Sequence, residues 1–146
     1  MPLIQSFIMK NITIQEKTYP DYKTCTELCE KIIKLDSNIN FVGLINDKGR
    51  HVTGASKKGT KFLVSKKDCE MLFMEVALRT RMRREFDPQM GPVNFSLSHR
   101  KKVIIMSIPF GNDFLYISAE PEFDFYKTPF KIVDILKEEK IPRNPI

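Results

Sequence analysis

The segment from Ser65 to about Phe86 constrains the fold more than any other, because its apolar residues repeat at the spacing of one long α-helix. At 1.5 Å per residue such a helix is roughly 30 Å long. One apolar stripe consists of Cys69, Leu72, Phe73, Val76, Ala77 and Thr80, and a second, on a neighbouring face, of Met71, Met74, Leu78 and Met82. A surface helix usually has a single apolar face. We therefore expect this helix to be covered on more than one side.

A helix and a hairpin are expected before this segment. The helix runs from about Tyr22 to Leu35, and Thr24 with Glu27 has the spacing of a capping box at its start. The hairpin has strands at 40–45 and 50–55. Gly49 stands where a type I turn followed by a bulge requires a left-handed residue.

Three strands and a helix are expected after it. A loop at 87–92 contains two prolines and a glycine, and the strands follow at 93–97, 103–110 and 114–120. Thr128 is expected to cap the last helix, with Pro129 in its first turn, and the helix to end near Lys140.

This order of elements predicts one α+β domain on a five-stranded antiparallel sheet with strand order 2-1-5-4-3. The long helix then crosses from the hairpin to the three-stranded meander, and the first and last helices cover one face. A chain of 146 residues has the commonest size for one domain. We assign residues 21–140 to the domain, 1–20 to an N-terminal segment of unassigned structure, and 141–146 to a tail.

The order of elements resembles the roadblock and profilin-like folds, and this resemblance implies dimerisation through the central helix and an edge strand. Five short segments resemble, across residues 22–137, a family of small uncharacterised proteins from ammonia-oxidising archaea. They are Phe41-Val-Gly-Leu-Ile-Asn46, Met82-Arg-Arg-Glu-Phe-Asp87, Gly91-Pro92, Arg100-Lys-Lys-Val103 and Ile117-Ser-Ala-Glu-Pro121. The family resemblance implies an archaeal origin and no particular activity.

Cysteine usage and hydropathy indicate a cytoplasmic protein. Cys25, Cys29 and Cys69 are odd in number and fall in expected helices, which argues against a disulfide framework. No apolar run approaches the ~20 residues of a membrane span, and the N-terminus lacks the features of a signal peptide. Cys25 and Cys29 share a helix face and could ligate a soft metal. We interpret them as core residues, because no histidine or Cys-x-x-Cys pair is near.

No catalytic constellation stands out. The stretch 54–60 echoes a phosphate-binding loop, but Thr60 occupies the position that requires lysine. His51 and His99 adjoin turns and have no nucleophile at a motif spacing. Glu120 and Glu122 flank a proline and are interpreted as exposed charges. The sequence thus predicts a non-enzymatic protein with no catalytic residue, cofactor or metal.

The chain carries a net charge of +6, which admits an anionic partner without demanding one. The candidate patch for such a partner consists of Arg79, Arg83, Arg84, Arg100, Lys101 and Lys102. Plain solvated charge is the alternative. Cations also favour a helix C-terminus by ~0.3–1 kcal/mol.

Methionine is frequent at partner-binding surfaces, so the leading hypothesis is an interaction, scaffold or regulatory module that dimerises through Met71, Met74, Leu78 and Met82. The dimer is formed with a second copy or a paralogue, and the basic residues contact an acidic protein. Alternatively, the methionine stripe lies under the N-terminal segment.

A second hypothesis is a sensor that binds a small anionic ligand in a site lined by Phe41, Phe62 or Phe110. Nucleic-acid binding is a third, and it is not favoured because no recognition helix or stacking motif is present.

Overall fold

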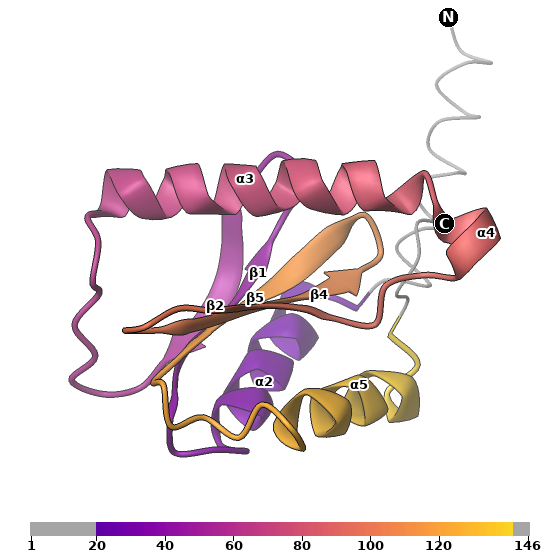
Figure 1. Ribbon diagram of the computed structural model, residues 1–146. Helices are drawn as coiled ribbons and strands as arrows, with labels where there is room; N and C mark the ends of the chain where they lie inside the picture. Colours follow the sequence, from indigo (N-terminus) through magenta and orange to yellow (C-terminus); the bar gives the residue numbers. More distant parts are fainter. Residues whose placement is uncertain (1–19, 142–146) are drawn as a thin grey trace, which may run out of the picture.

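The computed structural model describes residues 20–141, in which helices stand before, between and after two groups of strands (Figure 1). They are α2 (Tyr22–Ile33), β1 (Ile39–Ile45), β2 (His51–Ser56), α3 (Lys66–Arg84), α4 (Asp87–Met90), β3 (Ser96–His99), β4 (Ile104–Phe110), β5 (Asp113–Ala119) and α5 (Thr128–Glu138).

The five strands form one antiparallel sheet with the order β2-β1-β5-β4-β3, so the predicted strand order is confirmed. α3 lies across one face of the sheet, and α2 and α5 lie side by side against the other (Figure 1). The sheet is thus the middle layer of three. The N-terminal segment 1–20 predicted from the sequence falls, except for Pro20, outside the described residues.

The central strands β1 and β5 are buried on both faces, because helices cover the sheet from both sides. The larger part of the core lies between the sheet and the helix pair α2 and α5. The smaller part lies under α3 and consists of Phe41, Ile45, Phe73, Ala77, Phe114 and Tyr116. Within residues 20–141, one helix therefore covers a face that two helices cover on the opposite side.

The turn between β1 and β2 packs directly against the middle of α3. Gly49 has a φ of +80°, and a Cβ atom there would lie 2.8 Å from the Cα of Met74. Glycine is therefore required both by the left-handed conformation and by the close approach. The register of the hairpin shifts between Leu44 and Ile45, as expected for a turn with a bulge.

Two predicted helix caps are wrong. α2 begins one turn before the expected capping box: the N-cap is Asp21, whose Oδ1 accepts a hydrogen bond of 2.8 Å from the amide of Thr24. Thr24 thus already lies inside the helix, which also ends two residues earlier than expected, at Ile33. At α5, Lys127 holds the cap position without a side-chain bond, and Thr128 is the buried first residue of the helix.

Three boundaries on the C-terminal side also differ from the predictions. The expected loop at 87–92 contains the short helix α4, with Pro88 in its first turn, where the missing amide costs nothing. The strand expected at 93–97 is β3, which begins only at Ser96. α5 ends at Glu138, and Ile141, assigned to the tail, is 6 % exposed and packs into the core.

The N-cap of α2 generates a prediction about stability and pH. Its hydrogen bonds with Thr24 lower the pKa of Asp21. The stabilisation therefore operates above the unfolded-state pKa of about 3.9 and is lost as the pH falls through the lower folded-state value. We expect Asp21→Ala to lower the melting temperature at pH 7 and to have little effect at strongly acid pH. Calorimetry across this range tests the expectation.

Glu27→Ala is the matched control, because Glu27 is exposed and belongs to the capping box that the structure does not form. A larger loss of stability from Glu27→Ala than from Asp21→Ala at pH 7 would contradict the cap assignment.

Candidate functional site

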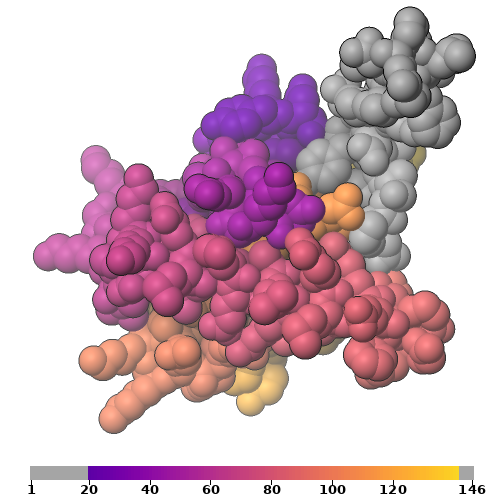
Figure 2. Space-filling model, turned by 90° about the horizontal axis from the view of Figure 1, so that it is seen from above, coloured from indigo at the N-terminus to yellow at the C-terminus, as the bar shows by residue number. Residues whose placement is uncertain are grey.

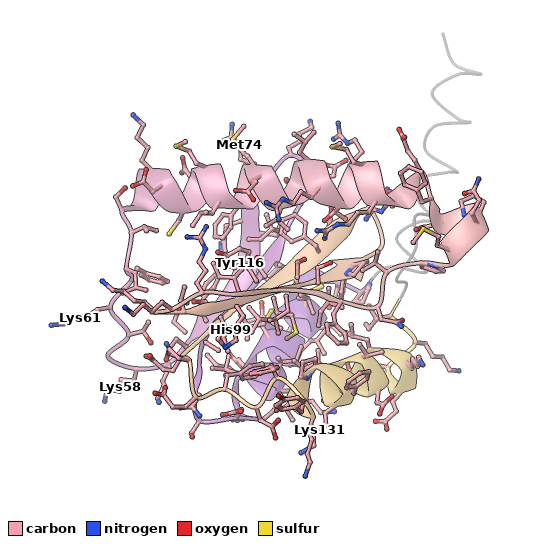
Figure 3. The ribbon with its side chains drawn as sticks, in the orientation of Figure 1. Lys58, Lys61, Met74, His99, Tyr116 and Lys131 are labelled. Atoms are coloured by element: carbon pink, nitrogen blue, oxygen red, sulfur yellow. The ribbon has the colours of Figure 1, made fainter. Side chains whose placement is uncertain are left out.

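The outer face of α3 carries large apolar side chains that nothing in residues 20–141 covers. Met71, Met74, Leu78 and Met82 are 57–62 % exposed, and we call these four residues the methionine face. Figure 2 looks down on α3, which lies open across this side of the molecule, and Figure 3 shows Met74 pointing away from the sheet. The other stripe of the helix packs on the sheet, with Phe73, Ala77 and Thr80 buried. The possibility that segment 1–20 covers the methionine face falls on residues outside the described range.

The methionine face is bordered by charged groups that hold neighbouring parts together. Glu75 and Arg79 form an exposed ion pair of 2.7 Å along the helix. On the other side, the guanidinium of Arg81 donates a 3.3 Å hydrogen bond to the carbonyl of Asp47 in the β1–β2 turn. Asp47 and Lys48 complete an open hollow along the helix. The face is therefore an apolar strip with a charged border, the usual composition of an interface core and rim.

The cations at the C-terminal end of α3 serve different neighbours. Arg83 donates a 2.6 Å bond to the hydroxyl of Ser96 in β3. Arg84 instead donates to the carbonyls of the β4–β5 turn, at 2.7 Å to Gly111, 3.3 Å to Asn112 and 3.5 Å to Asp113. Partial burial lowers its pKa. Arg84 is thus occupied in fixing a turn.

The remaining predicted cations lie elsewhere. Arg100, Lys101 and Lys102 are exposed in the connection between β3 and β4. Lys102 borders a pocket near the N-terminal half of α3, whereas Arg83 and Arg84 border a different hollow with Asp87 and Pro109. The structure does not bring the six predicted residues together into one patch.

A pocket of about 130 Å³ lies beneath the N-terminal half of α3, and we call it the α3 pocket. It is enclosed by α3, the β2–α3 loop and the ends of β1, β4 and β5. Its apolar lining includes Phe41, Phe62, Leu63, Val64, Leu72, Phe73, Ile105 and Tyr116. Of the phenylalanines predicted to line a ligand site, Phe41 and Phe62 are present. The prediction that Phe110 lines the site is wrong, because Phe110 is fully buried in the core on the opposite face of the sheet.

Aromatic rings form one wall of the α3 pocket. The ring centroids of Phe73 and Tyr116 are 4.9 Å apart in an edge-to-face arrangement, and those of Phe41 and Phe62 are 5.8 Å apart. Figure 3 shows Tyr116 between the sheet and α3. Burial is the largest of the effects that raise the pKa of Tyr116, to about 12, so its hydroxyl is protonated at neutral pH.

The cysteines separate into two kinds. Cys25 and Cys29 are buried in the core, where burial raises the pKa of their thiols to about 11 and about 12. Cys69 is only half-buried, at the wall of the α3 pocket, and burial raises its pKa as well. Residues 20–141 contain no cluster of three or more metal-ligating side chains.

The structure also defines the surroundings of the two histidines and of Glu120. The ring of His51 lies 5.9 Å from that of Phe41, and burial lowers the pKa of His51. His99 contacts the ring of Phe125. Glu120 accepts a 2.9 Å bond from Asn40 at the edge of the α3 pocket.

Comparison with known proteins places the chain in a family. Residues 11–141 match a family of unknown function, DUF6659, and the chain belongs to it. No curated protein matches the sequence. Within the described part of the chain, no helix has the length and apolar character needed to cross a membrane.

Solved structures share the fold at low sequence identity. The roadblock/LC7 domain from Streptomyces avermitilis superposes with a TM-score of 0.56 at 10 % identity, over 77 % of this chain and 93 % of that one. MglB in a tetrameric arrangement superposes with a TM-score of 0.62 at 12 % identity, over 82 % of this chain and 92 % of that one. Myxococcus xanthus MglB superposes with a TM-score of 0.60 at 14 % identity, over 82 % of this chain and 97 % of that one. The predicted roadblock-like fold is confirmed.

The environment of Arg84 predicts a structural role that can be measured. Arg84→Met leaves three carbonyls of the β4–β5 turn without their charged donor, so we expect a loss of about 2 kcal/mol in the free energy of unfolding. Arg79→Met removes only an exposed helix pair, and less than about 0.5 kcal/mol is expected. Urea denaturation compares the two, and equal losses would contradict the assignment.

Proposed function

We propose that this chain is a non-enzymatic interaction module of the roadblock-like type, in which two subunits associate through α3. The observation that carries the proposal is the methionine face, an uncovered apolar strip along the longest helix of the described chain. Large exposed apolar patches with polar borders mark interaction sites. The chain belongs to a family of unknown function, so the proposal rests on the surface itself.

The spacing of the methionine face suits a second copy of the same helix. At 100° per residue, positions 71, 74, 78 and 82 fall within an arc of about 80°. An antiparallel pair of helices with its two-fold axis near Val76 would place Met71 against Met82 of the partner subunit. It would place Met74 against Leu78 of the partner subunit. This self-complementarity is what a two-fold symmetric interface requires.

The edge strand β3 extends the same surface. β3 pairs with β4 alone among the described strands and lies beside α3, where Arg79 and Arg83 border a groove with Ser96 and Ser98. A short strand with a free edge can add a strand from another subunit. An interface of α3 and β3 is also what the resemblance to the roadblock folds implies.

The partner of the module is predicted to be a second copy of the chain, a paralogue or an acidic protein. A second copy fits the symmetry of the methionine face, and a paralogue with the same face would fit equally. We retain the acidic-protein hypothesis for Arg79, Arg83, Arg100, Lys101 and Lys102, and exclude Arg84 because its guanidinium binds the β4–β5 turn. A regulatory or scaffold role, an archaeal origin and a cytoplasmic location stay predictions as well.

The interface is tested by a charge at its centre. Met74→Glu would bury two unpartnered carboxylates per dimer, each at a cost of several kcal/mol. We therefore expect the dissociation constant of the dimer to rise on the order of 100-fold or more. Light scattering on a sizing column at low and high salt measures the mass, which should change from dimer to monomer.

Gln89→Glu is the matched control, because it adds the same charge on α4, away from the methionine face. The control should remain a dimer. A wild-type monomer, or a Met74→Glu variant with unchanged mass, would refute the proposed interface.

A further inference from the structure

The α3 pocket is a partly open hollow between α3 and the sheet. It has a volume of about 130 Å³. It arises where the N-terminal half of α3 and the β2–α3 loop bridge over the ends of three strands. Phe62, Leu63 and Val64 in that loop are 40–66 % exposed, so the outer wall of the pocket is apolar on both sides.

The size of the pocket limits its ligand. An engineered cavity of about 150 Å³ lined by Leu, Ile and Phe binds benzene. The α3 pocket therefore accommodates an apolar body of about one six-membered ring. The rings of Phe41, Phe73 and Tyr116 line it and pack against one another, so the lining suits a further aromatic group.

One buried polar group in the lining has no hydrogen-bond partner within the described part of the chain. Tyr116 is only 5 % exposed, and its hydroxyl makes no hydrogen bond with any residue between 20 and 141. Buried polar groups are nearly always hydrogen-bonded, to protein, water or ligand. Since burial holds the pKa of Tyr116 at about 12, the hydroxyl can donate to a ligand oxygen at neutral pH.

The charges around the pocket favour an anion. Lys61 and Lys102 lie at its mouth, against a single carboxylate, Glu120, which already accepts a bond from Asn40. Burial has the largest effect on the pKa of Tyr116; beyond the lining, the charge of Arg100 lowers this pKa and that of Glu75 raises it. Two lysines and one engaged carboxylate thus border an aromatic cavity.

We propose that the α3 pocket binds a small aromatic monocarboxylate, with the ring among Phe41, Phe62 and Leu72 and the carboxylate toward Lys61 and Lys102. The Tyr116 hydroxyl supplies a buried donor. The methionine face lies on the opposite side of α3 and contributes no residue to this pocket. The proposal therefore stands whether or not the chain dimerises.

The experiment uses the full chain and three probes of one ring size: sodium benzoate, benzyl alcohol and benzylamine. Benzoate is expected to raise the melting temperature in a dose-dependent way, the alcohol to raise it less, and the amine not at all. A second readout is alkylation of Cys69 by iodoacetamide, followed by mass spectrometry. Bound benzoate should slow this reaction, while Cys25 and Cys29, which are buried elsewhere, serve as internal references.

Variants distinguish the contribution of the aromatic lining to ligand binding from that of the positive charge. Lys102→Met should weaken benzoate two- to fivefold, about the contribution of an exposed ion pair, and leave benzyl alcohol unchanged. Lys58→Met is the control, because this lysine is also exposed and lies in the β2–α3 loop, but does not line the pocket. Phe62→Ala removes part of the outer wall and should weaken both ligands. Phe62 is 57 % exposed, so the variant is expected to fold.

Two results would overturn the proposal. If none of the probes stabilises the protein or protects Cys69, the pocket does not bind a ring of this size. If benzylamine binds better than benzoate, or Lys102→Met leaves the benzoate affinity unchanged, the assignment of an anionic ligand is wrong. None of these measurements depends on the mass of the assembly, so they can fail independently of the α3 interface.

Discussion

The pairing of β1 with β5 at the centre of the sheet is the constraint on which the rest of the structure depends. Both strands are buried on both faces, so each face of the sheet must be covered. Among the described residues, two helices cover one face and α3 covers the other (Figure 1). The α3 pocket opens where this single helix and the loop before it do not fill the space. The methionine face is the side of the same helix that points away from the sheet.

The sheet could be predicted from the sequence because its signals are local and repeated. Alternating or continuous apolar runs bounded by turn residues gave four of five strands to within a residue or two, and the order followed from one crossover helix. Where two local signals competed, prediction failed. Asp21 and Thr24 are both good N-cap residues, and only the hydrogen bond to the amide of Thr24 decides between them. The start of β3 depends on its neighbour, since Pro109 of β4 has no amide with which to extend the ladder toward Val93.

The candidate site was less predictable, because it depends on direction and on distant contacts. Sequence spacing correctly separated the two stripes of α3. It could not show that Arg83 and Arg84, adjacent in the chain, reach β3 and the β4–β5 turn respectively. Consecutive helical residues point about 100° apart, so cations close in sequence need not form one surface. The α3 pocket is assembled from five separate segments of the chain, so no local sequence motif predicts it.

The two proposed surfaces share one helix, which gives them a physical connection. Leu72 and Phe73 line the α3 pocket, and Met71 and Met74, their neighbours in sequence, belong to the methionine face. A rotation or shift of the N-terminal half of α3 would change both. A ligand alters the assembly only if its affinity differs between monomer and dimer, and the assembly then alters the ligand affinity by the same factor. Because the β1–β2 turn packs against the middle of α3 at Gly49, such a shift would have to occur on the N-terminal side of Met74, where the pocket lies.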